Sequence, residues 1–419
     1  MGKRVLALVL VLAICATAPI LASGQRDDSS RTNVEFWTFP DWGTGVAGDL
    51  FRTFVVEFEQ ANPDIRVSLV PKPDLEQAII AGAGAGVVPD AFTVAFNVGD
   101  TMLRTGIVQD VGPWFSAMPD SYRSQFSESW MAALSPDGKV YGLPFTAYAQ
   151  LLYRNTTVLE QAGVDTTRPI RDWADWLRQM EQVHQAGFYA LPNLTQDGWF
   201  VMGFVGAAGG RNGVSAGRTT VDEAALREAL DFYRQFQQYS SEIPAGDQAA
   251  VDMFTTNQLA FYIMGPWQNP AFQDAKAANP AFDYDYTLVP GASSELFGGT
   301  NGGEWIGVTS GPRAEAAWKW AAYLADAPQT TRFAADLGRT VLNDVAMADP
   351  RVRENTLNVL TAQATKYGFA DAAYFTFWPL DARVPFRDAA QAVCAGRSDA
   401  SAAARQALSE LNAVLARGR

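Results

Sequence analysis

The sequence predicts an α/β protein with two lobes that share the chain. In its N-terminal part, strand-like and helix-like segments alternate with short turns between them, a pattern typical of a mostly parallel sheet covered by helices on both faces. At 419 residues the chain has room for two or three domains. No internal repeat or low-complexity linker divides it, so we expect the chain to cross back and forth between the lobes.

The first elements follow from hydrophobic periodicity. Alternating apolar residues predict a strand at 34–38. Apolar residues on one face at 50–58 predict a helix, which Asn62-Pro63 ends. A second strand is expected at 65–69, a helix at 74–83 and a third strand within 87–94. These segments together form the repeating strand and helix units of a parallel sheet.

Later segments continue the mixture of strands and helices. A turn at 135–139 leads into an alternating and then apolar stretch at 140–153, which predicts further extended structure. Five more helices are expected from amphipathic spacing. They lie at 172–185, 222–238, 314–325, 351–366 and 398–416.

The segment 259–267 (LAFYIMGPW) is the most informative in the chain. A short apolar run, long enough for a buried strand, ends at Gly265-Pro266 and is followed by Trp267. In open α/β sheets, ligands bind beyond the carboxyl ends of the strands. The residues alone leave two interpretations of Trp267: a flat platform for a ligand, or a core tryptophan that anchors the turn.

The first 24 residues have the pattern of a secretory signal. A basic start is followed by an apolar stretch at 5–14 and small residues at 19–24, which predicts cleavage after Gly24. The apolar stretch is shorter than the ~20 residues that a bilayer requires, which argues against a membrane anchor. Cys15 leaves lipidation as an alternative, although the bulky Ile14 precedes it. We expect an exported, periplasmic protein.

Composition excludes several classes of function. The 45 acidic residues outnumber the 32 basic ones, which argues against nucleic acid and anionic lipid as partners. Cys394 is the one cysteine beyond the signal, and His184, near a predicted helix end, is the sole histidine. No disulfide, Cys/His zinc site or histidine-based catalytic centre is therefore expected. The glycine-rich segment 81–86 lacks the preceding strand and the following Lys-Ser/Thr of a phosphate-binding loop, so we expect no cofactor.

The tryptophans separate into two groups. Trp173, Trp176, Trp318 and Trp320 lie in helical patterns and are interpreted as packing residues. A second group lies beside Gly, Pro or Asp in predicted loops, where an aromatic face can stack on the C–H face of a sugar while amides and carboxylates bind its hydroxyl groups. This group consists of Trp42, Trp199, Trp267 and Trp378.

Acidic residues near these loops leave other ligands open. Asp41, Asp197, Glu304 and Asp381 would also suit a polyamine or another small cation, through charge and cation–π contact. A secreted carbohydrate-active enzyme would need two carboxylates with different roles, and nothing in the sequence pairs them.

Five segments follow one another along the chain: 57–67 (EFEQANPDIRV), 86–91 (GVVPDA), 141–146 (YGLPFT), 152–155 (LYRN) and 259–267. In this order they resemble the extracellular solute-binding proteins of bacterial ABC importers, in the carbohydrate family that includes maltose-binding protein. The resemblance covers nearly all of residues 33–416.

The resemblance implies two α/β lobes of the type II periplasmic binding protein kind, each a mostly parallel sheet flanked by helices. Hinge strands would join the lobes, which would close over a ligand in the cleft. The N-terminal lobe would comprise residues 33–146 and 300–349. The C-terminal lobe would comprise residues 147–299 and 350–419.

The resemblance also implies site residues. Trp267 matches the family's ligand-stacking tryptophan, and the loop 193–199 resembles the loop that supplies a polar side chain and an aromatic ring. The loop 38–42 matches the loop whose polar groups meet sugar hydroxyls. The segment 375–378 resembles a late aromatic cluster, and 298–304 matches a glycine-rich return into the first lobe. The candidate ligand-binding residues are Trp37, Asp41, Trp42, Asn97, Tyr148, Asp197, Trp199, Trp267, Asn301, Glu304, Trp378 and Asp381.

The chain departs from the family pattern at two positions. Glu304 stands where the family often has an apolar residue, and Arg339 follows Gly338 where a proline is common. Maltose binders carry a glutamate before the hinge strand, and the corresponding position in this chain falls near Ala147 and Tyr148. The ligand therefore need not be maltose.

The expected function is therefore that of a monomeric substrate-binding component, without catalysis. It would capture a sugar or oligosaccharide in the cleft and deliver it to the permease subunits of an ABC importer. A secreted carbohydrate-active enzyme and a polyamine or small-cation binder are the alternatives.

Overall fold

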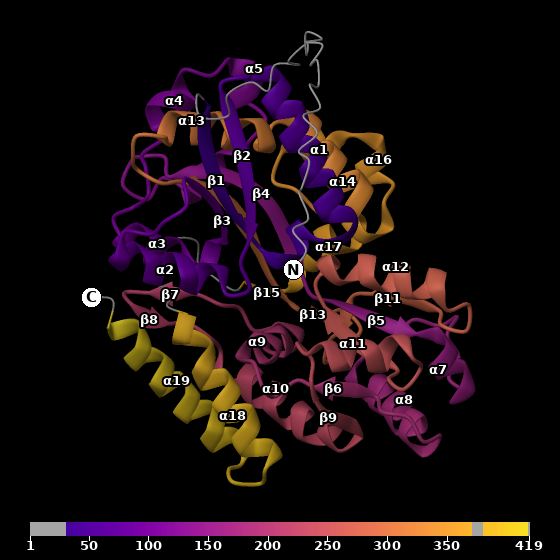
Figure 1. Ribbon diagram of the computed structural model, residues 1–419. Coiled ribbons are helices and arrows are strands. Elements are labelled where there is room, and N and C mark those ends of the chain that lie inside the picture. Colours follow the sequence, from indigo (N-terminus) through magenta and orange to yellow (C-terminus); the bar gives the residue numbers. More distant parts are fainter. Residues whose placement is uncertain (1–30, 371–379, 418–419) are drawn as a thin grey trace, which may run out of the picture.

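The computed structural model describes residues 31–370 and 380–417, which form two α/β lobes (Figure 1). The upper lobe in Figure 1 contains the N-terminal strands together with the helices from α13 to α16. The lower lobe contains the middle of the chain and the C-terminal helix pair. Within the described ranges, no helix has both the length and the apolar character that a membrane crossing requires.

A six-stranded sheet forms the centre of the first lobe. Strands β1, β2 and β3 are parallel, whereas β14 runs antiparallel to both β3 and β4. The path through the sheet is β15-β14-β3-β1-β2, with β4 also paired to β14. The strands are β1 (Thr32–Thr38), β2 (Ile65–Pro71), β3 (Ala91–Ala95), β4 (Gly142–Ala149), β14 (Thr300–Val308) and β15 (Phe369–Ala370).

The first three expected strands and the helices between them are present. The third strand begins at Ala91, later than the start of the expected stretch at Val87, since Pro89 has no N–H for a sheet ladder and Val87 is exposed. Helix α1 buries Phe51, Phe54 and Phe58 at helical spacing against the lobe's core.

The helices of the first lobe surround this sheet. They are α1 (Gly45–Ala61), α2 (Leu75–Ala85), α3 (Gly99–Arg104), α4 (Gly112–Ser116), α5 (Asp120–Arg123), α6 (Glu128–Ala133), α13 (Ala314–Ala325), α14 (Ala327–Leu337), α15 (Asp344–Ala348) and α16 (Pro350–Arg353).

The second lobe is built differently from the expectation of a mostly parallel sheet. Strand β5 (Leu151–Asn155) lies between β10 (Phe261–Met264) and β11 (Tyr284–Thr287) and is antiparallel to both. Among the described residues of this lobe, parallel pairing is confined to β6 (Leu191–Asn193) with β9 (Ser240–Pro244) and one bridge. Hydrophobic periodicity identifies a strand but not the direction in which it pairs. Strand β5 enters this lobe almost directly from β4, and the two strands paired with it have the opposite direction.

Short polar residues set the starts of the second lobe's helices. Asp172 and Asp222 accept backbone N–H bonds at the N-termini of α8 and α10, within a residue of the expected starts. The helix expected at 351–366 is instead two, because Asn355 caps a new helix α17 (Thr356–Tyr367). The remaining helices are α7 (Thr156–Gln161), α8 (Trp173–Gln185), α9 (Gly198–Ala207), α10 (Glu223–Phe236), α11 (Gln248–Thr255), α12 (Asn269–Ala278), α18 (Val384–Cys394) and α19 (Ala400–Ala416).

The buried apolar residues form separate cores for the two lobes. The first lobe has two clusters of buried apolar residues and the second lobe has one. Along the described residues, the chain changes between first-lobe and second-lobe clusters three times: between Ala147 and Tyr148, between Val289 and Trp305, and between Val352 and Leu357. The chain therefore crosses between the lobes repeatedly. The exact lobe boundaries remain a prediction.

Two of these crossings are bonded to each other. The backbone N–H of Gln150 donates to the carbonyl of Thr300 at 2.9 Å, and the N–H of Thr300 donates to the Gln150 side chain at 2.8 Å. Gly299 makes this approach possible, because it has φ +105° and a Cβ there would lie 2.7 Å from the Gln150 carbonyl oxygen.

Replacing Gly299 by alanine should therefore destabilise the protein. Backbone strain and the clash at Gln150 are together expected to lower the free energy of unfolding by about 1–3 kcal/mol, measured by urea denaturation. Gly246→Ala is the matched control, since a Cβ at Gly246 meets nothing within 4 Å. Equal stability of the two variants would contradict the role assigned to Gly299.

Candidate functional site

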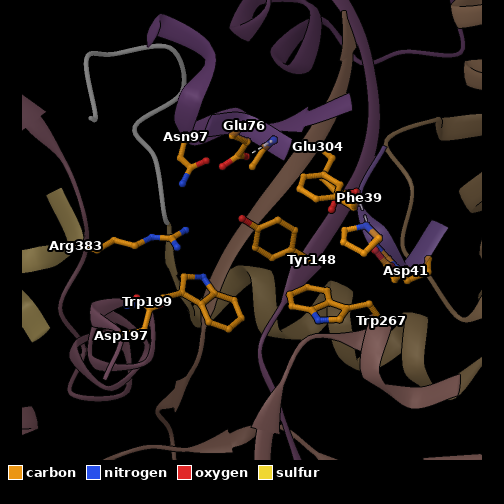
Figure 2. A pocket seen from close by; sticks show the side chains of 13 residues that line it. Phe39, Asp41, Glu76, Asn97, Tyr148, Asp197, Trp199, Trp267, Glu304 and Arg383 are labelled. Carbon is orange, nitrogen blue, oxygen red and sulfur yellow. Dashed lines mark hydrogen bonds and ion pairs between the residues drawn. The ribbon is translucent and has the colours of Figure 1, made fainter. Parts of the chain in front are cut away.

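A cavity of about 300 Å³ lies between the two lobes (Figure 2). Tyr148, Trp199 and Trp267 line it together with loop and strand residues of the first lobe. Its volume is at the lower end of the range for small-molecule sites. The cavity brings together side chains that are more than 200 residues apart in the sequence.

Three aromatic rings form one wall of the cavity. The ring centres of Trp199 and Trp267 are 5.9 Å apart, and Tyr148 meets Trp267 edge to face at 5.6 Å. Figure 2 shows the three rings grouped along one side of the cavity. Such a wall offers apolar faces with N–H and O–H groups at their rims.

The Gly-Pro-Trp sequence explains the position of Trp267. Strand β10 ends at Met264, and a single turn of 3-10 helix at Pro266–Gln268 follows. The indole folds back on Gly265 so closely that a Cβ there would lie 2.0 Å from the ring. Glycine is therefore required before the proline, and the strand's end positions the ring.

Trp199 is positioned by the N-terminus of α9. The Asp197 carboxylate accepts the backbone N–H of Trp199 at 2.9 Å and caps the helix. Gly198 packs against the carbonyl of Arg383, which leaves no room for a Cβ. This contact also brings Arg383, on the segment Leu380–Arg383, to the cavity.

An ionic group forms another wall of the cavity, with Arg339 and Glu304 buried and Asp41 half-buried. Arg339 Nη1 lies 3.0 Å from Asp41 Oδ2, and Arg339 Nη2 lies 3.7 Å from Glu304 Oε2. Thr146 donates its hydroxyl to the same Glu304 oxygen. The guanidinium carbon of Arg339 is 5.8 Å from the Trp267 ring centre, so the group reaches the aromatic wall of the other lobe. Glu304 and Arg339, the two departures from the family pattern, are thus partners.

Burial raises the pKa of Glu304 to about 7, although Arg339 and the Thr146 hydroxyl oppose this rise. The nearby Asp41 and Glu76 carboxylates raise it further. Around neutral pH, Glu304 is therefore divided between its acid and carboxylate forms.

The cavity also contains residues that the sequence did not single out. Glu76, in the first turn of α2, accepts the N–H of Ala95 at 3.2 Å, and Arg383 extends into the cavity in Figure 2. Neither residue belongs to a motif. Phe39 and Pro40 also line the cavity, and their place beside Asp41 in the predicted loop was the signal that could have identified them.

Seven of the twelve candidate residues line this cavity. They are Asp41, Asn97, Tyr148, Asp197, Trp199, Trp267 and Glu304.

Two tryptophan candidates lie in other surroundings. Trp42 is only 1% exposed, and its ring stacks on Phe51 at 4.9 Å, because the loop winds into a 3-10 helix that turns the ring into the core. Trp37 lies within β1 and donates its N–H to Glu35, with the Lys72 ammonium 4.1 Å from its ring centre. Neither residue lines the cavity.

The remaining candidates also lie away from the cavity or outside the described residues. Asn301 donates to the Thr365 carbonyl at 3.2 Å, which holds β14 against α17. Asp381 pairs with Arg417 of the C-terminal segment at 2.6 Å. Trp378 lies outside the described residues. In residues 31–370 and 380–417, no group of three or more His, Cys, Asp or Glu is arranged to hold a metal ion.

Comparison with known proteins identifies the class. The model of the bacterial extracellular solute-binding protein family matches residues 53–359, and the chain belongs to this family. It is 26% identical over 371 residues to the maltodextrin-binding protein MdxE of Bacillus subtilis (strain 168), covering 85% of this chain and 84% of that protein.

Solved structures show the same two-lobed fold. The GacH receptor of Streptomyces glaucescens GLA.O superposes with a TM-score of 0.78 at 17% identity, covering 92% of this chain and 99% of that one. The Thermus thermophilus maltotriose binding protein has a TM-score of 0.72 at 18% identity, covering 91% and 100%. The expected fold class and family are confirmed.

Glu304 should make the protein less stable as the pH rises. In the folded protein its pKa of about 7 exceeds the ordinary value of 4.5, so its contribution to the free energy of unfolding is fully present below pH 4.5 and is lost as the pH rises through 7. Glu304→Gln cannot ionise and should lack this loss, a difference of about 3 kcal/mol between pH 4.5 and pH 8 in urea unfolding.

Glu57→Gln provides the control for this measurement. Glu57 is a half-exposed carboxylate of the same lobe, paired with Arg332 outside the cavity, and its replacement should leave the pH dependence of the wild type in place. An equal pH dependence in Glu304→Gln and the wild type would contradict the burial argument.

Proposed function

We propose that the protein is the substrate-binding component of an ABC importer, which captures a sugar or oligosaccharide in the cavity between its lobes. The observation that supports this most strongly is the composition of the two walls. Aromatic faces of Trp199 and Trp267 stand opposite hydrogen-bonding groups that include Asp41, Asn97 and Glu304. A sugar has an apolar C–H face and a rim of hydroxyl groups, and this arrangement can bind both.

Capture would proceed by closure of the lobes. The chain crosses between the lobes on bonded segments near Gln150 and Thr300, and a ligand that contacts both walls would favour the closed state. The ligand-loaded monomer would then bind the membrane permease transiently. Neither step requires a chemical change in the ligand.

The same function requires export. The N-terminal signal would direct the protein to the periplasm with cleavage after Gly24, or to a lipid-anchored form if Cys15 were modified. Intact-mass measurement of the protein recovered from the periplasm distinguishes the two forms.

Isothermal titration with mono-, di- and oligosaccharides tests the proposal. Maltose, maltotriose and galactobiose are suitable first probes, and one-to-one binding is expected for at least one neutral saccharide. The absence of heat with every saccharide, together with tight binding of a polyamine such as spermidine, would contradict the proposal.

The two cavity tryptophans should carry much of the affinity. Trp267→Ala or Trp199→Ala removes a stacking face, and each should weaken saccharide binding by roughly 30-fold, or about 2 kcal/mol. Trp114→Ala is the matched control: this tryptophan is also partly buried but packs near Trp318 in the first lobe, away from the cavity. Circular dichroism checks that each variant is folded. Equal effects in all three variants would point to general destabilisation.

One observation favours a carbohydrate-active enzyme as the second candidate. A buried carboxyl group with a pKa near 7 is a property of general acids in glycoside hydrolysis. Prolonged incubation with labelled maltotriose and galactobiose distinguishes the two functions. We expect the saccharides to be recovered intact, and the appearance of shorter products would favour the enzyme.

A further inference from the structure

The charges that line the cavity are unbalanced. Among the described residues, four carboxylate side chains and two guanidinium groups line it. The carboxylates are Asp41, Glu76, Asp197 and Glu304, and the guanidinium groups are Arg339 and Arg383. This excess of negative charge restricts which saccharides can enter.

Arg339 is already engaged by two of the carboxylates. Its side chain is 4% exposed, with one terminal nitrogen 3.0 Å from Asp41 and the other 3.7 Å from Glu304. An anionic ligand that bound this guanidinium would lie beside both carboxylates, and their like charges would repel it unless it displaced one of them. Displacing Glu304 would leave a buried carboxylate without its cation, which is strongly unfavourable.

The other end of the cavity also has more negative than positive charge, with two carboxylates and one guanidinium among the described residues. Arg383 extends into it from the segment beside α9, and Glu76 and Asp197 line the same cavity. The Asp197 carboxylate caps α9, and Glu76 accepts the Ala95 amide. Ionised carboxylates accept hydrogen bonds but cannot donate them, so they favour ligand hydroxyl or amino groups over ligand carboxylates and phosphates.

We infer that the group of Asp41, Arg339 and Glu304 determines the charge class of the ligand, so that the cavity binds saccharides without acidic groups and rejects uronic acids and sugar phosphates. This inference rests on the proposed function, because it concerns which saccharides the same cavity binds. Within the group, Arg339 is a positioning residue, which holds the two carboxylates at the wall. Asp41 and Glu304 provide the acceptors for ligand donors.

The rejection of acids should depend on pH. Glu304 faces Arg339, Thr146, Asp41 and Glu76, and burial raises its pKa to about 7. Its negative charge therefore grows as the pH rises from 6 to 8. Discrimination against acidic saccharides should increase over the same interval.

The test compares neutral saccharides with matched acids. The probes are maltose, galactobiose and the same disaccharides oxidised at C6 to uronic acids, titrated calorimetrically into the full chain at pH 8. The neutral member of a bound pair should bind at least 30-fold more tightly than its uronic acid. Equal affinities would overturn the inference and leave the proposed function standing.

Variants then test the role of the ionic group. In Asp41→Asn/Glu304→Gln the Arg339 guanidinium loses both charged partners, and the preference for the neutral probe should fall at least tenfold. The single Glu304→Gln variant serves if the double variant does not fold, with a smaller shift in the same direction. An unchanged preference in a folded variant would overturn the role of the group.

Glu57→Gln is the matched control for these variants. This change removes the charged partner of Arg332, which pairs with Glu57 at 2.8 Å. Arg332 lies in the same lobe but outside the cavity, with its guanidinium carbon 4.9 Å from the Phe54 ring centre. The control should keep the wild-type preference. If the wild type binds no saccharide, neutral or acidic, both the proposed function and the inference fail. If it binds both members of a pair equally, only the inference fails.

Discussion

The antiparallel pairing of β4 with β14 is the contact on which the cavity depends. Its register places Tyr148 opposite Gly302 and Thr146 opposite Glu304, residues far apart in the sequence. Gly302 leaves room for the Tyr148 phenol, since a Cβ there would lie 2.5 Å from the hydroxyl oxygen. The chain passes between the lobes near the end of β4 and again near the start of β14, so this ladder joins the crossing segments and brings Tyr148 and Glu304 to the cavity.

The two walls are supported by different forces. The aromatic wall depends on local backbone features, the glycine before the Trp267 turn and the Asp197 cap of α9, so short segments largely determine it. The ionic wall depends on tertiary contacts alone, because Asp41, Glu304 and Arg339 come from three separate parts of the first lobe. A buried ionic group is a costly feature to maintain. Its presence in the cavity is best understood through ligand selection rather than through stability.

Local patterns predicted the elements better than their pairing. Short-range periodicity and capping identified the first three strands and most helix starts, because these signals lie within one segment. These local signals did not predict three features: the strand direction in the second lobe, the break before α17 at Asn355, and the burial of the Trp42 ring in the core. Each of these depends on which surface a segment meets, and that information is not local.

By itself, the sequence determined the α/β class and the placement of Trp267 at the end of a strand, and it predicted an export signal and no histidine- or cysteine-based chemistry. Those conclusions rest on composition, periodicity and turn residues. Only the tertiary structure decided that Glu304 and Arg339 are partners, that Glu76 and Arg383 reach the cavity, and that Trp37, Trp42 and Asn301 do not. The physical reason is that charge pairing and burial are properties of side chains brought together across the fold, and no single segment contains both members of such a pair.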